Sequence, residues 1–295
     1  ITFDKRWSAI WRAKDIMCSL GLFEVSTYSF ISEKQIADIG AKPAGHLKLK
    51  NPLSSEQAYL RSDLLPSLLK TAERNRSYSR EFGVFEFSRV YVSRGEGKLP
   101  AEPLRLGVLI RTEAGGYKSA KRALDCLARE FNLQISITPQ AFGTMAHPAN
   151  AAVIKAGTEV IGLLCQLHPV LTKRHKISAE IGYLEVDWDR LMSAVIPRVY
   201  REASRYPSIE RDIAIVLKSD INWNKIEQGI NASELASAEF LSDYYGSDLP
   251  KGHKSLAIRL HFQSMDRTLT DKEAEAGEKK VLALLKKRFG AAPRK

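Results

Sequence analysis

Residues 205–217 read RYPSIERDIAIVL, residues 242–263 read SDYYGSDLPKGHKSLAIRLHFQ, and residues 266–290 read DRTLTDKEAEAGEKKVLALLKKRFG. Alternating apolar residues in the first two stretches indicate strands, and helical spacing in the third indicates a helix. The predicted order is strand (211–217), helix (223–230), strand (238–245), strand (255–263) and helix (271–289). This order is most of a split βαββαβ motif, a small sheet with helices on one face.

The last of these helices has clear signals at both ends. Thr270 and Glu273 are spaced as a capping box at its start, and Gly290 follows its end. Basic residues 286–288 suit the negative C-terminal end of a helix. The motif's final strand has to come from residues 291–295, which are poor strand formers.

The predicted strand 238–245 ends in residues that suit contact with unpaired RNA bases. Asp243 supplies a hydrogen-bond acceptor, and Tyr244 and Tyr245 supply aromatic faces. The next strand begins after a loop with Lys251, His253, Lys254 and Ser255. Proteins read single-stranded RNA by stacking on aromatic rings and bonding to base edges, while cations hold the phosphates. The sequence therefore predicts an RNA-binding edge on this sheet.

These three stretches resemble the ferredoxin-like anticodon-binding domain of the β subunit of bacterial phenylalanyl-tRNA synthetases. NPLSSEQAYLRSDLLPSLL (51–69), GVFEFSRVY (83–91) and VIGLLCQLHPVL (160–171) are similar to the catalytic-like module before that domain. The resemblance implies an α+β chain with two domains. Residues 1–197 would form a class II synthetase-like antiparallel sheet module, and residues 198–295 a ferredoxin-like βαββαβ domain.

The resemblance also assigns residues to RNA binding. It implies that Tyr245 stacks on an anticodon base and that Asp243 and Ser255 form hydrogen bonds beside it. Lys254 and Arg259 are added as cations on the same strand. Because side chains alternate along a strand, one tyrosine of the pair is expected to pack inward, and Tyr244 is the candidate for this inward position.

The N-terminal part of the chain predicts a larger antiparallel sheet with helices at intervals. Helices are expected at residues 4–20, at 62–72 after an N-cap at Ser62 that places Pro66 in the first turn, and around 124–131. Strands are expected at 82–92, 104–110, 151–156, 159–167 and 181–186, with a tight turn at Gly157. The proline-bounded segment 197–207 is predicted to be a linker.

Composition narrows the class of protein. A chain of 295 residues with 44% hydrophobic content favours two domains, and its net charge of +11 suits a polyanionic partner. No run of about 18 apolar residues predicts a membrane span, and the N-terminal charges argue against a signal peptide, so a cytoplasmic protein is expected. Cys18, Cys126 and Cys165 are scattered and are expected to be buried, reduced thiols.

No stretch of the sequence predicts an active site. Arg89 is on a plausible strand but lacks the acidic partner of an ATP-binding arginine, and His147 and His168 precede prolines and are expected at turns. No P-loop, GxGxxG, HExxH or CxxC pattern occurs. We therefore expect no catalytic, cofactor or metal site in this chain.

Two other features have structural interpretations. Arg211 and Asp212 are expected to form a structural ion pair or a contact between domains. Trp7 and Trp11 lie on a helical stripe that is expected to pack into the core, with an exposed partner surface as the alternative.

The resemblance implies that ATP, magnesium and phenylalanine act on a separate α subunit, within an α2β2 heterotetramer that binds tRNA(Phe). In that family the editing domain and the other N-terminal domains of the β subunit lie upstream of the part that this chain resembles. Two alternatives remain at this point: a stand-alone RNA-binding protein, and a self-sufficient synthetase-like ligase.

Overall fold

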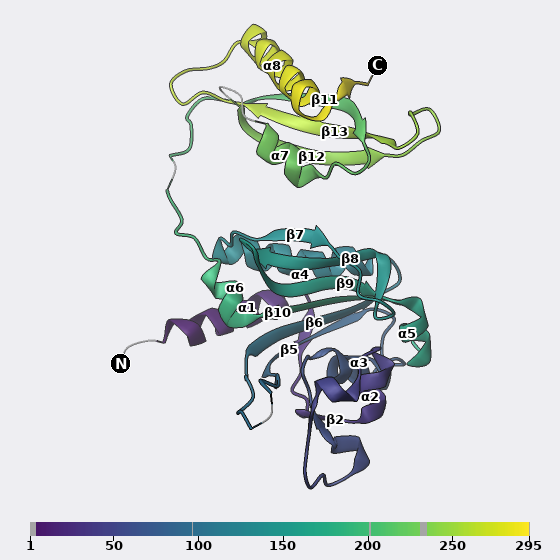
Figure 1. The fold of residues 1–295 in the computed structure, drawn as a ribbon. Helices are drawn as coiled ribbons and strands as arrows, with labels where there is room; N and C mark the ends of the chain where they lie inside the picture. The colour runs from purple at the N-terminus through teal and green to yellow at the C-terminus, as the bar shows by residue number, and fades with distance from the viewer. Residues whose placement is uncertain (1–3, 96, 201, 231–234, 295) are drawn as a thin grey trace. The chain divides into compact units, whose positions relative to one another are not determined.

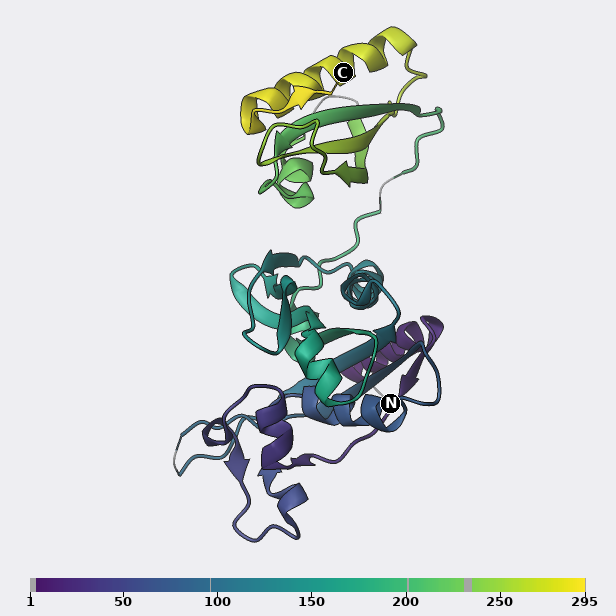
Figure 2. The ribbon, with the colours of Figure 1, turned by 90° about the vertical axis from the view of Figure 1, so that its right-hand side faces the viewer.

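The structure is a computed structural model that describes residues 4–95, 97–200, 202–230 and 235–294. Chain contacts divide it into two units, Ile1–Arg198 and Val199–Lys295, whose elements are labelled in Figure 1 and turned in Figure 2. Arg201 of the predicted linker and Lys295 of the predicted final strand lie outside the described residues. Each unit is described separately.

The first unit is built on a seven-stranded sheet. Its strands, in spatial order, are β1 (Leu22–Glu24), β5 (Phe82–Arg89), β6 (Leu104–Thr112), β10 (Glu180–Asp187), β9 (Glu159–Leu167), β8 (Ala146–Ala156) and β7 (Ser136–Pro139). Neighbours pair antiparallel except β1 and β5, which are parallel. Gly157 has φ +59° in the tight turn between β8 and β9. The predicted antiparallel α+β sheet is therefore confirmed.

Helices cover both faces of this sheet. One hydrophobic core joins it to α1 (Lys5–Ser19), α4 (Gly116–Phe131) and α6 (Trp188–Ser193). A second core joins its other face to α3 (Leu65–Arg74) and α5 (Pro169–Arg174). Gly107 on β6 lets α3 approach closely, because a Cβ there would lie 2.9 Å from side-chain atoms of Leu64 and Leu68.

Helix α1 begins where the sequence predicts, with the Asp4 side chain accepting a hydrogen bond from the Arg6 amide. Its buried residues are Ile10, Ala13 and Met17. Trp7 and Trp11 are instead 60% and 63% exposed, so the prediction that they pack into the core is wrong. The buried stripe runs along a different face of the helix from the tryptophans.

Helix α3 departs from its predicted start. Pro66 lies in the first turn as expected, but the helix begins at Leu65, and Ser62 does not cap it. The Ser62 hydroxyl bonds to Asp63 and His46 instead. The Leu64 amide donates to the Glu185 carboxylate at 2.9 Å, so a side chain from the sheet satisfies the helix N-terminus.

A small accessory sheet joins segments that the sequence analysis did not assign to strands. It contains β2 (Phe30–Ile31), β4 (Tyr59–Leu60) and β3 (Leu47–Lys48), packed against α2 (Glu33–Asp38). Short 3-10 turns at Pro43–Gly45 and Ser55–Gln57 flank these strands. Their core includes Ile31, Ile36 and Tyr59.

The second unit has the predicted βαββαβ order. It consists of β11 (Ile209–Lys218), α7 (Trp223–Gly229), β12 (Leu235–Tyr244), β13 (His253–Phe262), α8 (Asp271–Phe289) and β14 (Ala292–Pro293). The sheet order is β12-β13-β11-β14, all antiparallel. Figure 2 shows α8 lying along one face of this sheet. Alternate residues of β11 and β13 pack with α7 and α8 in one core.

The ends of α8 match their sequence signals. Thr270 and Glu273 form the capping box, and Gly290 ends the helix at φ +64°. The weak final stretch does form a strand, but only Ala292 and Pro293 pair with β11. Proline suits this outer position because its nitrogen has no hydrogen to donate.

The cysteines do not share one environment. Cys165 is buried, and burial raises the pKa of its thiol to about 12. Cys18 is exposed and Cys126 is half-buried, so the prediction of three buried thiols holds for Cys165 alone. Among the described residues, no helix combines the length and the apolar character needed to cross a bilayer.

Candidate nucleic-acid interface

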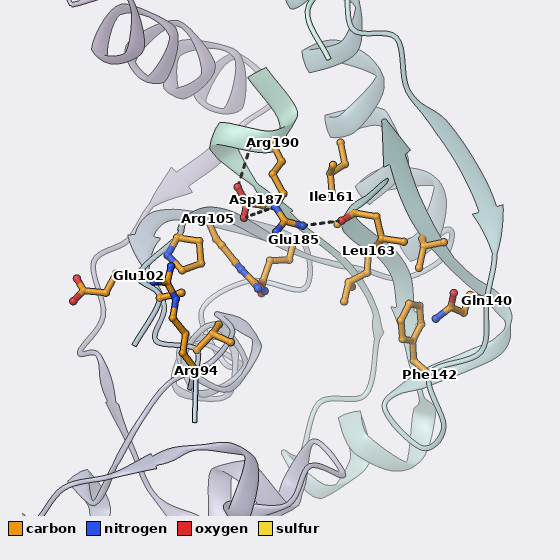
Figure 3. A pocket seen from close by; sticks show the side chains of 16 residues that line it. Arg94, Glu102, Arg105, Gln140, Phe142, Ile161, Leu163, Glu185, Asp187 and Arg190 are labelled. Carbon is orange, nitrogen blue, oxygen red and sulfur yellow. Dashed lines mark hydrogen bonds and ion pairs between the residues drawn. The ribbon is translucent and has the colours of Figure 1, made fainter. Parts of the chain in front are cut away.

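The sheet of the first unit has a hollow on one face, with a volume of about 710 Å³. Figure 3 shows Arg105 and Glu185 meeting on one side of this hollow and Phe142 on the opposite side. Arg190, at its edge, pairs with Glu159 at 2.9 Å and with Asp187 at 3.6 Å. Two of the three arginines that line the hollow, Arg105 and Arg190, are therefore already paired with carboxylates.

The floor of the hollow continues into a buried polar cluster. Glu185 accepts hydrogen bonds from Arg105, the Tyr183 hydroxyl and the Leu64 amide. Burial and the negative charge of Glu185 raise the pKa of Asp63 to about 7. Oδ1 of Asp63 has no hydrogen-bond partner, so nothing at that oxygen stabilises the charged carboxylate.

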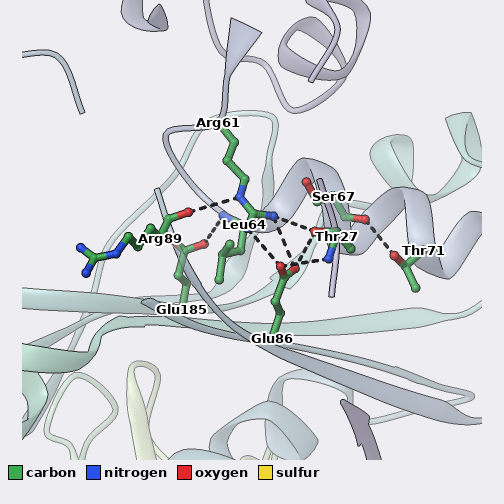
Figure 4. A network of polar contacts seen from close by, with 8 residues as sticks. All are labelled: Thr27, Arg61, Leu64, Ser67, Thr71, Glu86, Arg89 and Glu185. Carbon is green, nitrogen blue, oxygen red and sulfur yellow. Dashed lines mark hydrogen bonds and ion pairs between the residues drawn. The ribbon is translucent and has the colours of Figure 1, made fainter. Parts of the chain in front are cut away.

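A second buried network joins Arg61, which follows β4, and Thr27, in the loop after β1, to Glu86 on β5 of the sheet (Figure 4). The Arg61 guanidinium is fully buried and donates to Glu86 at 3.0 Å and to Thr27 at 2.7 Å. Thr27 donates to the same carboxylate through its amide and its hydroxyl. Because every partner is satisfied, this buried ion pair has a structural role.

Three polar residues of the first unit were considered above as active-site candidates, and each makes a hydrogen bond to the backbone. Arg89 donates to the backbone carbonyl of Glu102 at 2.9 Å. His168 caps α5 by accepting from the Val170 amide, and His147 accepts from the Ala149 amide. His168 lies at the turn between β9 and α5 as predicted, whereas His147 lies within β8, so the prediction of a turn there is wrong. Neither histidine bonds to a second catalytic-type side chain among the described residues.

In the second unit, strand alternation separates a core face from an open face. On β13, Leu256, Ile258, Leu260 and Phe262 are buried in the core with the helices. The residues between them point to the other face, where β12 places Tyr244 opposite Ser255 and Glu239 opposite Arg259. Register shifts between Leu235 and Ser237 and between Phe240 and Ser242 interrupt β12, the edge strand.

Tyr245 lies just beyond β12 and is 60% exposed. Its hydroxyl donates to the Asp243 carboxylate at 3.1 Å. Partial burial and this bond raise the pKa of the Tyr245 phenol, so the ring stays neutral at physiological pH. The structure therefore brings the predicted stacking residue and the predicted acceptor together in one exposed pair.

Tyr244 is also exposed, at 46%, so the prediction that it packs inward is wrong. The shift between Phe240 and Ser242 changes the alternation before the strand ends. The Arg294 guanidinium lies 4.7 Å from the centre of the Tyr244 ring and bonds to Asp248 at 2.9 Å. The sequence analysis missed Arg294, because the only signal was one cation in a weak terminal strand.

Two predicted RNA contacts are not on the surface. Ser255 is 4% exposed and lies between Tyr244 on β12 and Val216 on β11 in the sheet register. Lys254 is 7% exposed, because its place in the alternation puts it on the core side with Leu256. This correction removes both side chains from the accessible interface.

Arg259 reaches the open face but is paired. Its guanidinium donates twice to the Asp212 carboxylate, both bonds at 2.8 Å, and lies 3.6 Å from Glu210. The bond to Asp212 raises the pKa of Arg259 and lowers that of Asp212. Arg211 pairs with Asp271 on α8. The predicted ion pairs of Arg211 and Asp212 are confirmed, and Arg259 is a neutralised cation.

The accessible residues at this end of the sheet form what we call the tyrosine edge: Asp243, Tyr244, Tyr245, Asp248 and Arg294. It offers the rings of Tyr244 and Tyr245 and the Asp243 carboxylate, while Asp248 and Arg294 are paired with each other beside the Tyr244 ring. Stacking on rings and hydrogen bonding to base edges are how proteins bind unpaired nucleotides. The tyrosine edge has the chemistry of such an interface.

Each of the two units matches the model of a known protein family. The family model "Phenylalanyl tRNA synthetase beta chain CLM domain" matches residues 2–188, and "Ferredoxin-fold anticodon binding domain" matches residues 204–294. A phenylalanine–tRNA ligase beta subunit of Moorella thermoacetica is 33% identical over 98% of this chain and 38% of its own length. One of Geobacillus kaustophilus is 34% identical over 96% of this chain and 37% of its own length.

A solved pyrrolysyl tRNA synthetase from Desulfitobacterium hafniense shares the fold of part of the chain. It superimposes with a TM-score of 0.52 and 14% identity, covering 64% of this chain and 68% of the other. The chain spans well under half the length of its curated relatives. It belongs to the phenylalanyl tRNA synthetase beta chain family.

Proposed function

We propose that the chain acts within a phenylalanine–tRNA ligase, where residues 199–295 bind the anticodon of tRNA(Phe). The observation that carries this proposal is the tyrosine edge, with Tyr244 and Tyr245 exposed beside Asp243 and Arg294. The match of residues 204–294 to an anticodon-binding family supports it. Aminoacylation in the cytoplasm is then the activity of the assembled enzyme.

The first unit is proposed to support a catalytic α subunit in an α2β2 assembly. Trp7, Trp11 and Phe23 are each at least 60% exposed on α1 and β1, and β1 is an edge strand. Lys14 lies over the Trp11 ring and pairs with Glu24 on β1, which joins the two elements. Exposed aromatic residues with few unpaired cations beside them are typical of a protein-binding surface. An RNA-binding surface would need cations for the phosphates.

ATP and magnesium are proposed to act on the α subunit. The hollow of the first unit does not fit a triphosphate well, because Arg105 is paired with Glu185 and Arg190 with Asp187, so neither guanidinium is free to bind phosphates. We assign no chemical step to residues of this chain.

Binding of tRNA(Phe) to the purified chain tests the anticodon proposal. For about three phosphate contacts, the slope of log K against log salt is expected to be roughly −2 to −3. Replacing the anticodon bases of the tRNA should weaken binding, while replacing a base pair in the acceptor stem should not. Equal affinity for tRNAs with any anticodon would contradict the proposal.

Two measurements address the alternatives. A self-sufficient ligase would catalyse ATP–pyrophosphate exchange without an α subunit, and we expect no exchange. A stand-alone RNA-binding protein would not associate with a phenylalanine–tRNA ligase α subunit, whereas we expect co-purification. Replacing Trp7 and Trp11 by alanine should abolish this association and leave the thermal stability unchanged, because both rings are exposed.

A further inference from the structure

The last residue of α3 and the short loop after it combine exposed arginines with an exposed aromatic ring. Residues 74–80 read RNRSYSR, and we call them the arginine loop. Arg74, Arg76 and Arg80 are exposed, and Tyr78 is 80% exposed. Aromatic residues interleaved with cations are typical of surfaces that bind RNA strands.

The cations of this loop are largely free of acidic partners. Arg74 and Arg76 have no ion pair among the described residues, and the Arg76 guanidinium donates to the backbone carbonyl of Glu73. Arg80 lies 3.5 Å from Glu113, but both side chains are mostly exposed, so water and salt screen the pair. The Glu73 carboxylate faces His175 instead. Positive charge therefore remains available to a polyanion.

The loop is held in a defined shape by a buried arginine. Arg111 on β6 is 9% exposed and donates to the backbone carbonyls of Arg76 at 2.6 Å and Ser79 at 3.0 Å. The Tyr78 amide donates to the Asn75 carbonyl, closing a turn. A loop fixed before binding loses less conformational entropy when a ligand arrives.

A hollow of about 630 Å³ borders the loop at Arg74. Its lining includes Lys70 and Arg74, one turn apart on α3, and the exposed rings of Tyr28 and Phe30. Lys70 lies 3.5 Å from Glu56, and both side chains are partly exposed. Cations and aromatic faces thus continue from the arginine loop along α3.

RNA fits this surface better than a protein does. The arginine loop contains no aliphatic residue, whereas protein interfaces need an apolar centre that is depleted of charge. The contrast with the surface of Trp7, Trp11 and Phe23 is clear, because that region is aromatic with few free cations. An RNA backbone supplies the phosphates, and unstacked bases or sugars supply faces for Tyr78.

We infer that the arginine loop and the adjoining face of α3 form a second RNA contact, which binds the phosphate backbone of tRNA outside its anticodon stem and loop. The inference rests on the proposed function, since it takes tRNA as the RNA. Arg74 and Arg76 would neutralise phosphates, and Tyr78 would stack on an exposed nucleotide. Arg111 is a positioning residue, which holds the loop without touching RNA.

The experiment compares two RNAs with the full chain: complete tRNA(Phe), and a hairpin carrying only the anticodon stem and loop. The double variant Arg74→Ala, Arg76→Ala should bind complete tRNA about tenfold or more weakly, with a salt slope shallower by roughly 1.5, because two phosphate contacts are lost. Its affinity for the hairpin should not change. Tyr78→Ala should weaken only complete tRNA, by about fivefold or more, and Tyr78→Phe should restore binding.

A charge-matched control comes from another exposed loop of the same unit. Arg94→Ala, Lys98→Ala also removes two positive charges and should leave both affinities unchanged. Unfolding curves of all the variants verify that the exposed substitutions leave the fold intact. Arg111→Lys should weaken complete tRNA alone, because it loosens the loop without removing a charge.

The outcomes separate this inference from the anticodon proposal. If the arginine variants bind complete tRNA as tightly as the parent, or if the control loses the same affinity, the second contact is refuted. If Tyr245→Ala leaves hairpin binding unchanged while the arginine variants weaken complete tRNA, the anticodon proposal fails and the second contact stands. If the arginine variants bind an α subunit more weakly but bind RNA as the parent does, the surface binds protein and the inference is overturned. Absence of binding to either RNA overturns both.

Discussion

Tyr245 offers the sharpest single-residue test of RNA binding, because its ring is exposed and its hydroxyl is held by Asp243. Tyr245→Ala should cost about 1 to 3 kcal/mol of affinity for an anticodon hairpin, the usual value of one base–aromatic stack. Tyr245→Phe keeps the stacking face and should lose much less. Equilibrium binding of the hairpin to the three proteins measures the difference.

Tyr244→Ala is the comparison for Tyr245→Ala, and because the Tyr244 ring is exposed we expect only a small loss of stability. A buried tyrosine would destabilise the fold by about 3 to 5 kcal/mol on truncation, but the exposed ring of Tyr244 should cost under about 1 kcal/mol in urea unfolding. Unfolding of the domain by Tyr244→Ala would show that the ring is needed in the core. RNA affinity of the same variant reports whether Tyr244 and Arg294 share the contact.

Asp63 predicts a pH dependence of stability. Its folded pKa, about 7, lies above its ordinary value of 3.8, so the folded state holds the proton more tightly than the unfolded state does. The stabilisation is complete below pH 4 and is lost as the pH rises through 7. Relative to Asp63→Asn, the parent should lose about 2 to 3 kcal/mol between pH 5 and pH 8. Urea unfolding at each pH measures this loss of stability. If the unfolding free energies of the parent and of Asp63→Asn change with pH in parallel, the prediction is wrong.

Individual side chains were harder to predict than their strands. Tyr245 and Asp243 could be nominated because they end a strand beside a loop, but the register shift after Phe240 exposes Tyr244 too. No local pattern signals such a shift. The Arg294 guanidinium contacts the Tyr244 ring from the end of β14, which pairs with β11 and not with β12, and spacing along the sequence cannot reveal that contact.

At the scale of elements, the capping box of Thr270 and Glu273 fixes where α8 begins. Thr270→Ala removes the capping hydroxyl and should destabilise the second unit by about 0.5 to 2 kcal/mol in thermal or urea unfolding. Glu273→Gln keeps a capping side chain but loses the ion pair with Arg267, so it should cost less. A larger loss for Glu273→Gln than for Thr270→Ala would show that the ion pair outweighs the cap.

The long strands could be predicted from the sequence, and the short ones could not. Strand β9 was predicted with its observed ends, and β5, β6 and β10 within a few residues, because each is a run of eight or nine residues rich in apolar, strand-forming side chains. Strands β2, β3 and β4 have two residues each, too few for any period to appear. The start of α3 was misplaced at Ser62 because its cap comes from Glu185, 121 residues beyond Leu64.

At the scale of the molecule, the hydrophobic core of the second unit contains residues of that unit alone. Residues 199–295 expressed alone should therefore fold and bind the anticodon hairpin with the affinity of the full chain. Circular dichroism and hairpin titration measure both properties. Loss of structure in the isolated unit would show that it depends on the first unit, and loss of hairpin affinity without loss of structure would place part of that interface in residues 1–198.

Strand β12 is ten residues long and lies at the edge of its sheet, where unpaired backbone groups can recruit a strand from a second copy. Its two register shifts break the straight ladder that such a strand would need, and the carboxylates of Glu239 and Asp243 place negative charge on this edge strand. The edge that presents the tyrosines to solvent thus resists fibril-like stacking. The protein can keep aromatic rings exposed without inviting aggregation.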